Sequence, residues 1–282
     1  MFGLTRVVKD LVVRPHHTSA APDVGAGLRT LARVALAPIA AFPRTAARLP
    51  DLLRTLGERG LAIPASRRRT PDAVLALRAL AGFVRSDREV RDGYLSLLTA
   101  TMDRAIADDV HPSFVELLGQ LGGDELRILA SLGNDGPFPL LSLSSRLRHG
   151  GASRIELRHF SLLGDRAACD APMRTPAYLD NLARLGLVEI RPTRITDDVR
   201  MFEELENHPI VVAARTRIED QPPVRIGPIS EPIVADLQYK SLFVTAFGGQ
   251  FRRACFFRPD IDTDIEPPAS HLVHESAQAP TM

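Results

Sequence analysis

Three consecutive helices, predicted between Ser86 and Leu132, constrain the fold of this chain more than any other stretch. Apolar residues recur there at spacings of three and four, so each segment has one apolar face and one polar face. Ser86 and Glu89 have the spacing of a capping box at the start of the first helix, and Ser113 and Glu116 repeat it at the second. The connections are short, which predicts that neighbouring helices pack together.

The composition is that of a folded, water-soluble protein. The chain has 282 residues, of which 45% are hydrophobic and 24% charged, and this length allows one large or two ordinary domains. The net charge of +1 provides no overall attraction to nucleic acid or membrane. Two cysteines, Cys169 and Cys255, are too few for a four-thiolate zinc site, and no uncharged apolar run reaches about 18 residues. We therefore expect a cytoplasmic protein.

The composition also changes along the chain, which predicts four parts. Residues 1–22 are expected to be a frayed or disordered N-terminus, and residues 23–110 a helical domain. Residues 111–257 are expected to form a winged-helix-like domain. Residues 258–282 are acidic and polar and are expected to be a disordered tail.

The winged-helix expectation rests on the order of the predicted elements. Helices at 113–121, 124–132 and 176–186 are followed by strands near 187–190 and 241–245. The segment 191–240 between those strands has about 50 residues, far more than a hairpin loop of 2–5. The predicted fold class is therefore mainly α, with a helical N-terminal part and a winged-helix-like α/β C-terminal part that carries a long insertion.

Residues 23–42 are predicted to form an amphipathic helix with Arg29 and Arg33 on its polar side. Such a helix can pack on its own domain, which we favour, or it can lie on an anionic membrane surface or bind a partner.

Nucleic-acid binding is the strongest physical alternative to protein recognition. If the 176–186 helix is a recognition helix, Arg174 and Arg184 are the candidate nucleic-acid contacts, although Asp180 on the same helix has the wrong charge. The arginine run Arg67–Arg69 can also contact phosphates, but no stacking aromatic residues lie beside it.

His111 is the residue most suggestive of catalysis, because Asp108, Asp109 and Glu116 are near it in sequence. A base oriented by an acid is the arrangement used in general acid–base catalysis. The sequence places no nucleophile beside it, so we favour a histidine that caps the following helix.

Metal-ligand residue types occur at His149, His159, Cys169 and Asp170, but their spacing does not match a compact zinc pattern. The chain also lacks a G-K-[ST] phosphate loop and a G-x-S-x-G nucleophile turn. We therefore expect no metal, no cofactor and no catalytic residues, and a protein that is not an enzyme.

Several motifs together carry a family resemblance. They are the Asp87–Met102 helix, an H-P-S-F-x-E motif at 111–116, the L-x-x-L-x-x-L-G-L pattern at 179–187 and a T-x-x-G-x-x-F motif at 245–251. Over about residues 70–256 the chain resembles the Abi-alpha (abortive infection alpha) family of bacterial proteins. Seven motif residues have no role that the resemblance supplies: His111, Pro112, Phe114, Glu116, Thr245, Gly248 and Phe251.

The resemblance implies a role in anti-phage defence by abortive infection, in which an infected cell stops growing or dies before the phage matures. We expect a non-enzymatic protein that recognises a protein partner, a phage component or nucleic acid. The alternatives are a DNA-binding winged-helix transcriptional regulator and a membrane-surface effector that uses residues 23–42.

Overall fold

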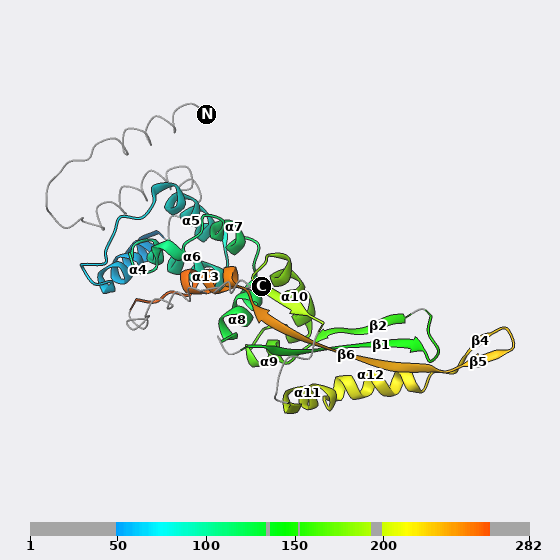
Figure 1. The fold of residues 1–282 in the computed structure, drawn as a ribbon. Coiled ribbons are helices and arrows are strands. Elements are labelled where there is room, and N and C mark those ends of the chain that lie inside the picture. Colours follow the sequence, from blue (N-terminus) through cyan, green and yellow to red (C-terminus); the bar gives the residue numbers. More distant parts are fainter. Residues whose placement is uncertain (1–48, 134–135, 152, 193–198, 260–282) are drawn as a thin grey trace, which may run out of the picture.

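The structure is a computed structural model that describes residues 49–133, 136–151, 153–192 and 199–259 (Figure 1). The predictions for residues 1–22, for the 23–42 helix and for the tail beyond residue 259 lie outside the described residues.

Helices form a compact body at one end of the molecule. The body is made of α4 (Leu49–Ala62), α5 (Ala73–Arg85), α6 (Arg88–Thr101), η1 (Ala107–Asp109), α7 (Phe114–Leu118), α8 (Gly123–Ser131) and α13 (Ala246–Cys255). Asp72 caps α5, because its Oδ1 accepts a hydrogen bond from the backbone N–H of Leu75 at 2.8 Å. The three helices predicted between Ser86 and Leu132 are present as α6, α7 and α8, although α7 is shorter than expected.

The two predicted capping boxes were wrong. Ser86 ends α5 instead of beginning α6, since its hydroxyl donates to the carbonyl oxygen of Gly82 at 2.8 Å. Ser113 precedes α7, but its side chain makes no capping hydrogen bond within the described part of the chain, and Glu116 forms an ion pair with Arg78. Both serines satisfy the spacing rule, but their side chains point to other partners.

A four-stranded antiparallel sheet makes up the second half of the fold. Its strands are β1 (Phe138–Leu147), β2 (Ser153–Phe160), β3 (Val188–Arg191) and β6 (Ile233–Val244), in the order β2-β1-β6-β3. The fold is mixed α/β, so the prediction of a mainly α chain was wrong. The error arose at β1 and β2, where buried serines and exposed charged residues interrupt the apolar pattern that marks a strand.

Helices and a small hairpin complete the chain. The segment between β2 and β3 contains α9 (Leu163–Arg166), η2 (Pro172–Arg174) and α10 (Thr175–Arg184). The segment predicted as an insertion contains α11 (Val199–Glu206), α12 (Pro209–Glu219), β4 (Val224–Ile226) and β5 (Ile229–Glu231). β4 and β5 form a separate two-stranded hairpin within that segment.

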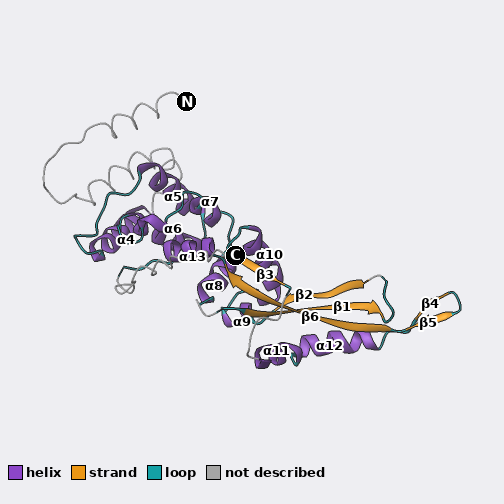
Figure 2. Cartoon of the chain, in the orientation of Figure 1, coloured by secondary structure: helices purple, strands orange, loops and turns teal. Residues whose placement is uncertain are grey.

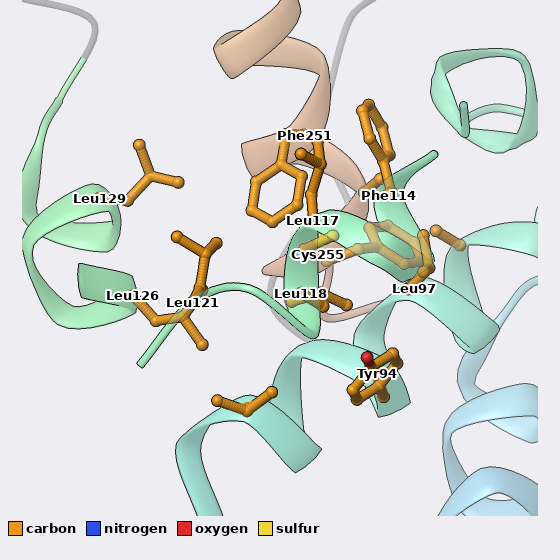
Figure 3. Close-up of a cluster of buried hydrophobic side chains, with 14 of the residues drawn as sticks. Tyr94, Leu97, Phe114, Leu117, Leu118, Leu121, Leu126, Leu129, Phe251 and Cys255 are labelled. Atoms are coloured by element: carbon orange, nitrogen blue, oxygen red, sulfur yellow. The ribbon is translucent and has the colours of Figure 1, made fainter. Parts of the chain in front are cut away.

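Two apolar cores hold these elements. The main core joins the helical body to the inner end of the sheet, and Tyr94, Phe114 and Phe251 are among its largest buried side chains (Figure 3). This core contains residues from both sides of position 110, where the sequence predicted the boundary between two domains. A second core lies between the sheet and helices α11 and α12, where Leu141 and Leu143 of β1 are buried against α11 and α12.

Strands β1, β2 and β6 extend away from the helical body, with α11 and α12 along one face and the β4–β5 hairpin at the far end (Figure 2). We call these seven elements the β-arm. β6 runs the whole length of the β-arm and leads directly into α13 of the body. Among the described helices, none combines the length and the apolar character needed to cross a membrane.

Candidate functional site: the β-arm and the polar cluster at its base

The structure brings the H-P-S-F-x-E motif at 111–116 and the T-x-x-G-x-x-F motif at 245–251 together in one aromatic cluster. Phe114 of α7 contacts Phe247 and Phe251 of α13, with ring centroids 5.3 and 5.2 Å apart. The ring of His111 lies 5.7 Å from that of Phe247. Such tilted and edge-on aromatic pairs stabilise beyond the area that they bury. The motif aromatics therefore attach the last helix to the body.

Thr245 and Gly248 fix the start of α13. The Thr245 hydroxyl accepts a hydrogen bond from the N–H of Gly248 at 2.8 Å and donates one to the carbonyl oxygen of Gly186 at 2.6 Å. A Cβ atom at Gly248 would overlap the carbonyl oxygen of Leu187. Thr245 thus acts as an N-cap, and Gly248 allows α13 to approach the backbone that leads into β3.

His111 and its acidic neighbours do not form an acid–base pair. Asp109 accepts two hydrogen bonds from Arg253 of α13, at 2.8 and 2.9 Å, and Glu116 is paired with Arg78. His111 is exposed, and its Nδ1 accepts the backbone N–H of Ser113 at 3.2 Å, at the start of α7. Pro112 beside it lines an open hollow of about 360 Å³ on the body.

The candidate nucleic-acid contacts lie at opposite ends of α10. Arg174 is exposed at the end that follows η2, and Arg184 is at the other end. Arg184 donates to Gln120 at 3.2 Å and to Asn181 at 2.8 Å, so its guanidinium is held against the body. In the 67–69 run, Arg67 forms two hydrogen bonds with the buried carboxylate of Asp103, at 2.9 and 2.6 Å.

The four residues of metal-ligand type have separate partners. His149 is near Glu231, His159 is near Asp180, and Asp170 is paired with Arg127, while Cys169 donates to a backbone oxygen of α8. Across the ranges that the structure describes, no group of three His, Cys, Asp or Glu side chains is arranged to hold a metal ion.

A second group of charges, around Asp124 at the start of α8, ties three segments together. The Asp124 carboxylate accepts hydrogen bonds from Arg127 at 2.5 Å, from Tyr178 at 2.8 Å, and from the backbone N–H groups of Asp170 and Ala171 at 2.9 and 3.1 Å. Burial alone raises the pKa of Asp124, but these four donors lower it far below its usual range. Every acceptor position is used, which is the arrangement of a structural carboxylate.

The sequence reasoning missed a polar cluster at the base of the β-arm, where α10 meets the sheet. The imidazole of His159 lies between Asp180 of α10 and Lys240 of β6. Its Nδ1 is 3.2 Å from Asp180 Oδ1, and its Nε2 accepts a hydrogen bond from the Lys240 ammonium at 3.3 Å. Arg158 also binds Asp180, at 3.1 Å. We call these four residues the Lys240 cluster.

The backbone of β2 is distorted at this cluster. β2 has one extra residue between Leu157 and Phe160, where it pairs with Leu141 and Leu143 of β1, and His159 there has a φ of +47°. A non-glycine residue in this left-handed region is strained, and such bulges redirect side chains near functional sites. The N–H of His159 donates to the hydroxyl of Ser142 on β1 at 3.1 Å, which holds the distorted segment in place.

Burial makes both basic groups of the cluster harder to protonate. It lowers the pKa of His159, and the charges of Lys240 and Arg158 lower it further, while Asp180 opposes them. Burial and Arg158 also lower the pKa of Lys240. One feature of the sequence could have drawn attention to this site. The chain has 33 arginines but only two lysines, Lys9 and Lys240, so a lysine at position 240 departs from the general use of arginine as the basic residue.

The outer end of the β-arm exposes apolar side chains. On the β4–β5 hairpin, Val224 is 41% exposed and Ile229 is 63% exposed, and Ile155 of β2 is also exposed. The hairpin lies beyond the second core, so these side chains contribute little to holding the sheet on α11 and α12.

Comparison with known proteins gives the family. A solved structure of an uncharacterized protein from the hydrocarbon-degrading marine bacterium Alcanivorax borkumensis SK2 is similar over 55% of this chain and 96% of that chain, with 23% sequence identity and a TM-score of 0.34. A search of curated proteins found no match. The family model for abortive infection alpha matches residues 44–255, which is most of the sequence, so this chain belongs to the abortive infection alpha (Abi-alpha) family.

Proposed function

We propose that this protein acts in anti-phage defence by abortive infection, and that it does so by binding a protein partner through the outer end of its β-arm, without catalysing a reaction. The family to which the chain belongs supports the defence role. The β-arm supports the binding role. The motif residues that could suggest chemistry, from His111 to Phe251, are engaged in packing and capping, which favours recognition over catalysis.

The observation that carries this proposal is the apolar exposure on the β4–β5 hairpin. Val224 and Ile229 belong to a hairpin whose strands are only three residues long, and an isolated hairpin of this size gains little stability from its own pairing. Apolar side chains at the end of a projecting element are typical of a surface that binds another protein. An apolar groove on the partner, able to take both side chains, fits this surface.

The test is phage yield in bacteria that express the protein. We expect the double variant Val224→Asp, Ile229→Asp to lose protection, because two carboxylates cannot enter an apolar groove without a large desolvation penalty. The matched control is Ser230→Asp on the same hairpin, which adds a negative charge at a position that is already polar and exposed. It should protect as the wild type does.

Thermal unfolding separates loss of binding from loss of folding. The double variant should unfold within about 2 °C of the wild type, since the substituted side chains lie outside both cores. Full protection by the double variant would contradict the proposed role of the hairpin. Loss of protection by Ser230→Asp as well would show that the effect is one of charge and not of apolar contact.

A further inference from the structure

Lys240 is in an unusual position for an ammonium group. It is the only lysine in the part of the chain that the structure describes, and its side chain crosses β1, because β6 and β2 flank β1 on opposite sides. Its ammonium donates to the neutral nitrogen of His159, and no carboxylate of a described residue lies within 4.0 Å of it. A partly buried cation is costly unless an anion compensates it.

The charges around Lys240 do not balance. Arg158 from β2 and Lys240 from β6 are both cationic, and Asp180 from α10 is the one acid that faces them and the imidazole of His159. Asp236, further along β6, is paired with Arg146 of β1 at 3.3 Å. The cluster therefore has an excess of one positive charge with His159 neutral.

His159 is 7% exposed, and its Nδ1 lies 3.2 Å from Asp180 Oδ1, so Asp180 is already engaged by the imidazole as well as by Arg158. A buried hydroxyl further along the same face of β1 also has no partner within the part of the chain that the structure describes. The hydroxyl of Ser144 is buried and has no hydrogen-bond partner among the described residues. Ser144 follows Ser142 on the same face of β1, the face that Lys240 crosses. Unsatisfied buried polar groups are rare in native proteins, and each calls for an explanation.

We propose that the Lys240 cluster is a binding site for the phosphate group of a small ligand. A phosphate dianion supplies the missing negative charge and accepts hydrogen bonds from the Lys240 ammonium and from Arg158, whose guanidinium is more than half exposed beside it. The strained backbone at His159 holds the imidazole beside the Lys240 ammonium. This inference does not depend on the partner of the β4–β5 hairpin.

Binding is linked to protonation. The pKa values of Lys240 and His159 are lowered although Asp180 opposes this, and a bound phosphate must raise both values. By linkage, phosphate binding favours the protonated forms of the two side chains.

The presence of only two lysines makes the test direct. In the full-length protein labelled with [13Cε]lysine, the NMR spectrum contains two lysine signals, and the variant Lys240→Gln identifies the signal of Lys240 by its loss. Adding inorganic phosphate at constant ionic strength should shift the Lys240 signal with saturation and raise its pKa, while the signal of Lys9 serves as an internal control. Equal shifts of the two signals, or no shift of the Lys240 signal, would overturn the proposal.

Variants identify which residues bind the phosphate. Arg158→Gln should weaken phosphate binding, followed at the Lys240 signal, by about tenfold, the loss expected for one charge-assisted hydrogen bond. The matched control is Arg215→Gln, which removes an exposed arginine of α12 that is paired with Glu219, and it should leave the affinity unchanged. Equal affinities for Arg158→Gln and the wild type would contradict the assignment. The circular dichroism spectrum of each variant must match that of the wild type.

A comparison of ligands distinguishes the source of the phosphate. Tighter binding of adenosine monophosphate than of inorganic phosphate would assign the site to a nucleotide, and equal binding would assign it to the free phosphate group. Chloride or sulfate that shifts the Lys240 signal as strongly as phosphate would show only screening of an uncompensated charge, and would refute a phosphate site.

Discussion

Two carboxylates bind the same nitrogen of one arginine, and they should differ greatly in their contribution to stability. Arg127 Nη2 lies 2.5 Å from Asp124 and 2.6 Å from Asp170, but the Asp124 side chain is 10% exposed and that of Asp170 is 86% exposed. Asp124 also accepts hydrogen bonds from Tyr178 and from two backbone N–H groups. Because Asp124 and Asp170 are at almost the same distance from Arg127 but differ in exposure, comparing them separates the effect of burial from the effect of distance.

Removing the buried carboxylate leaves several donors without an acceptor. Asp124→Ala takes the partner from Arg127, from the Tyr178 hydroxyl and from the N–H groups of Asp170 and Ala171. Water replaces some of these bonds, so the loss is smaller than their sum, and we expect the free energy of unfolding to fall by about 3–5 kcal/mol. Asp170→Ala removes one exposed ion pair and should lower it by less than about 1 kcal/mol.

Urea denaturation at pH 7, followed by circular dichroism, measures both changes. In thermal unfolding followed by the same signal, we expect the melting temperature of Asp124→Ala to fall by about 10 °C and that of Asp170→Ala by about 2 °C or less. A difference between the two variants of less than about 1 kcal/mol would refute the reasoning, because it would mean that burial adds nothing to this ion pair.

Acidity provides a second measurement on the same carboxylate. Burial opposes ionisation of Asp124, yet its hydrogen bonds hold its pKa well below the unfolded value of about 3.9. The stabilisation is therefore complete above about pH 5 and is lost as the pH falls below the unfolded pKa toward the folded one. Asp124→Asn should remove this component, so the stability difference between wild type and variant should shrink between pH 4 and pH 2.

Three further predictions concern other parts of the molecule. Gly248→Ala should lower the free energy of unfolding by about 2–4 kcal/mol, because the added Cβ overlaps the backbone at Leu187. Gly249→Ala should stabilise α13 by up to about 1 kcal/mol, because the nearest atom to its added Cβ is 3.6 Å away. Urea titration measures both changes. Burial raises the pKa of the Cys169 thiol to about 11, so at pH 8 it should react with iodoacetamide about a hundredfold more slowly than an exposed thiol, measured by mass spectrometry. Because the pKa of His159 is lowered in the folded state, the unfolded chain takes up a proton first as the pH falls. From pH 7 to pH 5 in phosphate-free buffer, the free energy of unfolding should therefore fall more for the wild type than for His159→Asn. The difference between the two slopes is at most about 1.4 kcal/mol per pH unit.

The helices of the body could be predicted from sequence because their signals are local. Arg88–Thr101 and Gly123–Ser131 are close to the predicted ranges, since an apolar stripe at helical spacing identifies the buried face without knowledge of its partner. The helix boundaries were less certain, because a capping side chain such as that of Ser86 has more than one acceptor within reach.

The strands were harder to predict because their burial depends on distant partners. β2 lies at the edge of the sheet, and His159 is the only residue of this strand that is buried. The sequence of β2 therefore shows no alternation of apolar and polar residues. For the same reason the sequence did not indicate the Lys240 cluster. Lys240 and His159 are 81 residues apart and meet only because β1 pairs with both β2 and β6.

The place of α13 in the helical body has a consequence for synthesis of the protein. Arg253 of α13 binds Asp109, 144 residues earlier in the chain, and Phe251 fills the core beside Phe114. During synthesis on the ribosome, the core formed by the early helices can therefore be completed only after α13 has been synthesised. At about 5–20 residues per second the delay is roughly 10–30 s, during which the nascent chain exposes the unfilled apolar surface and remains a substrate for chaperones.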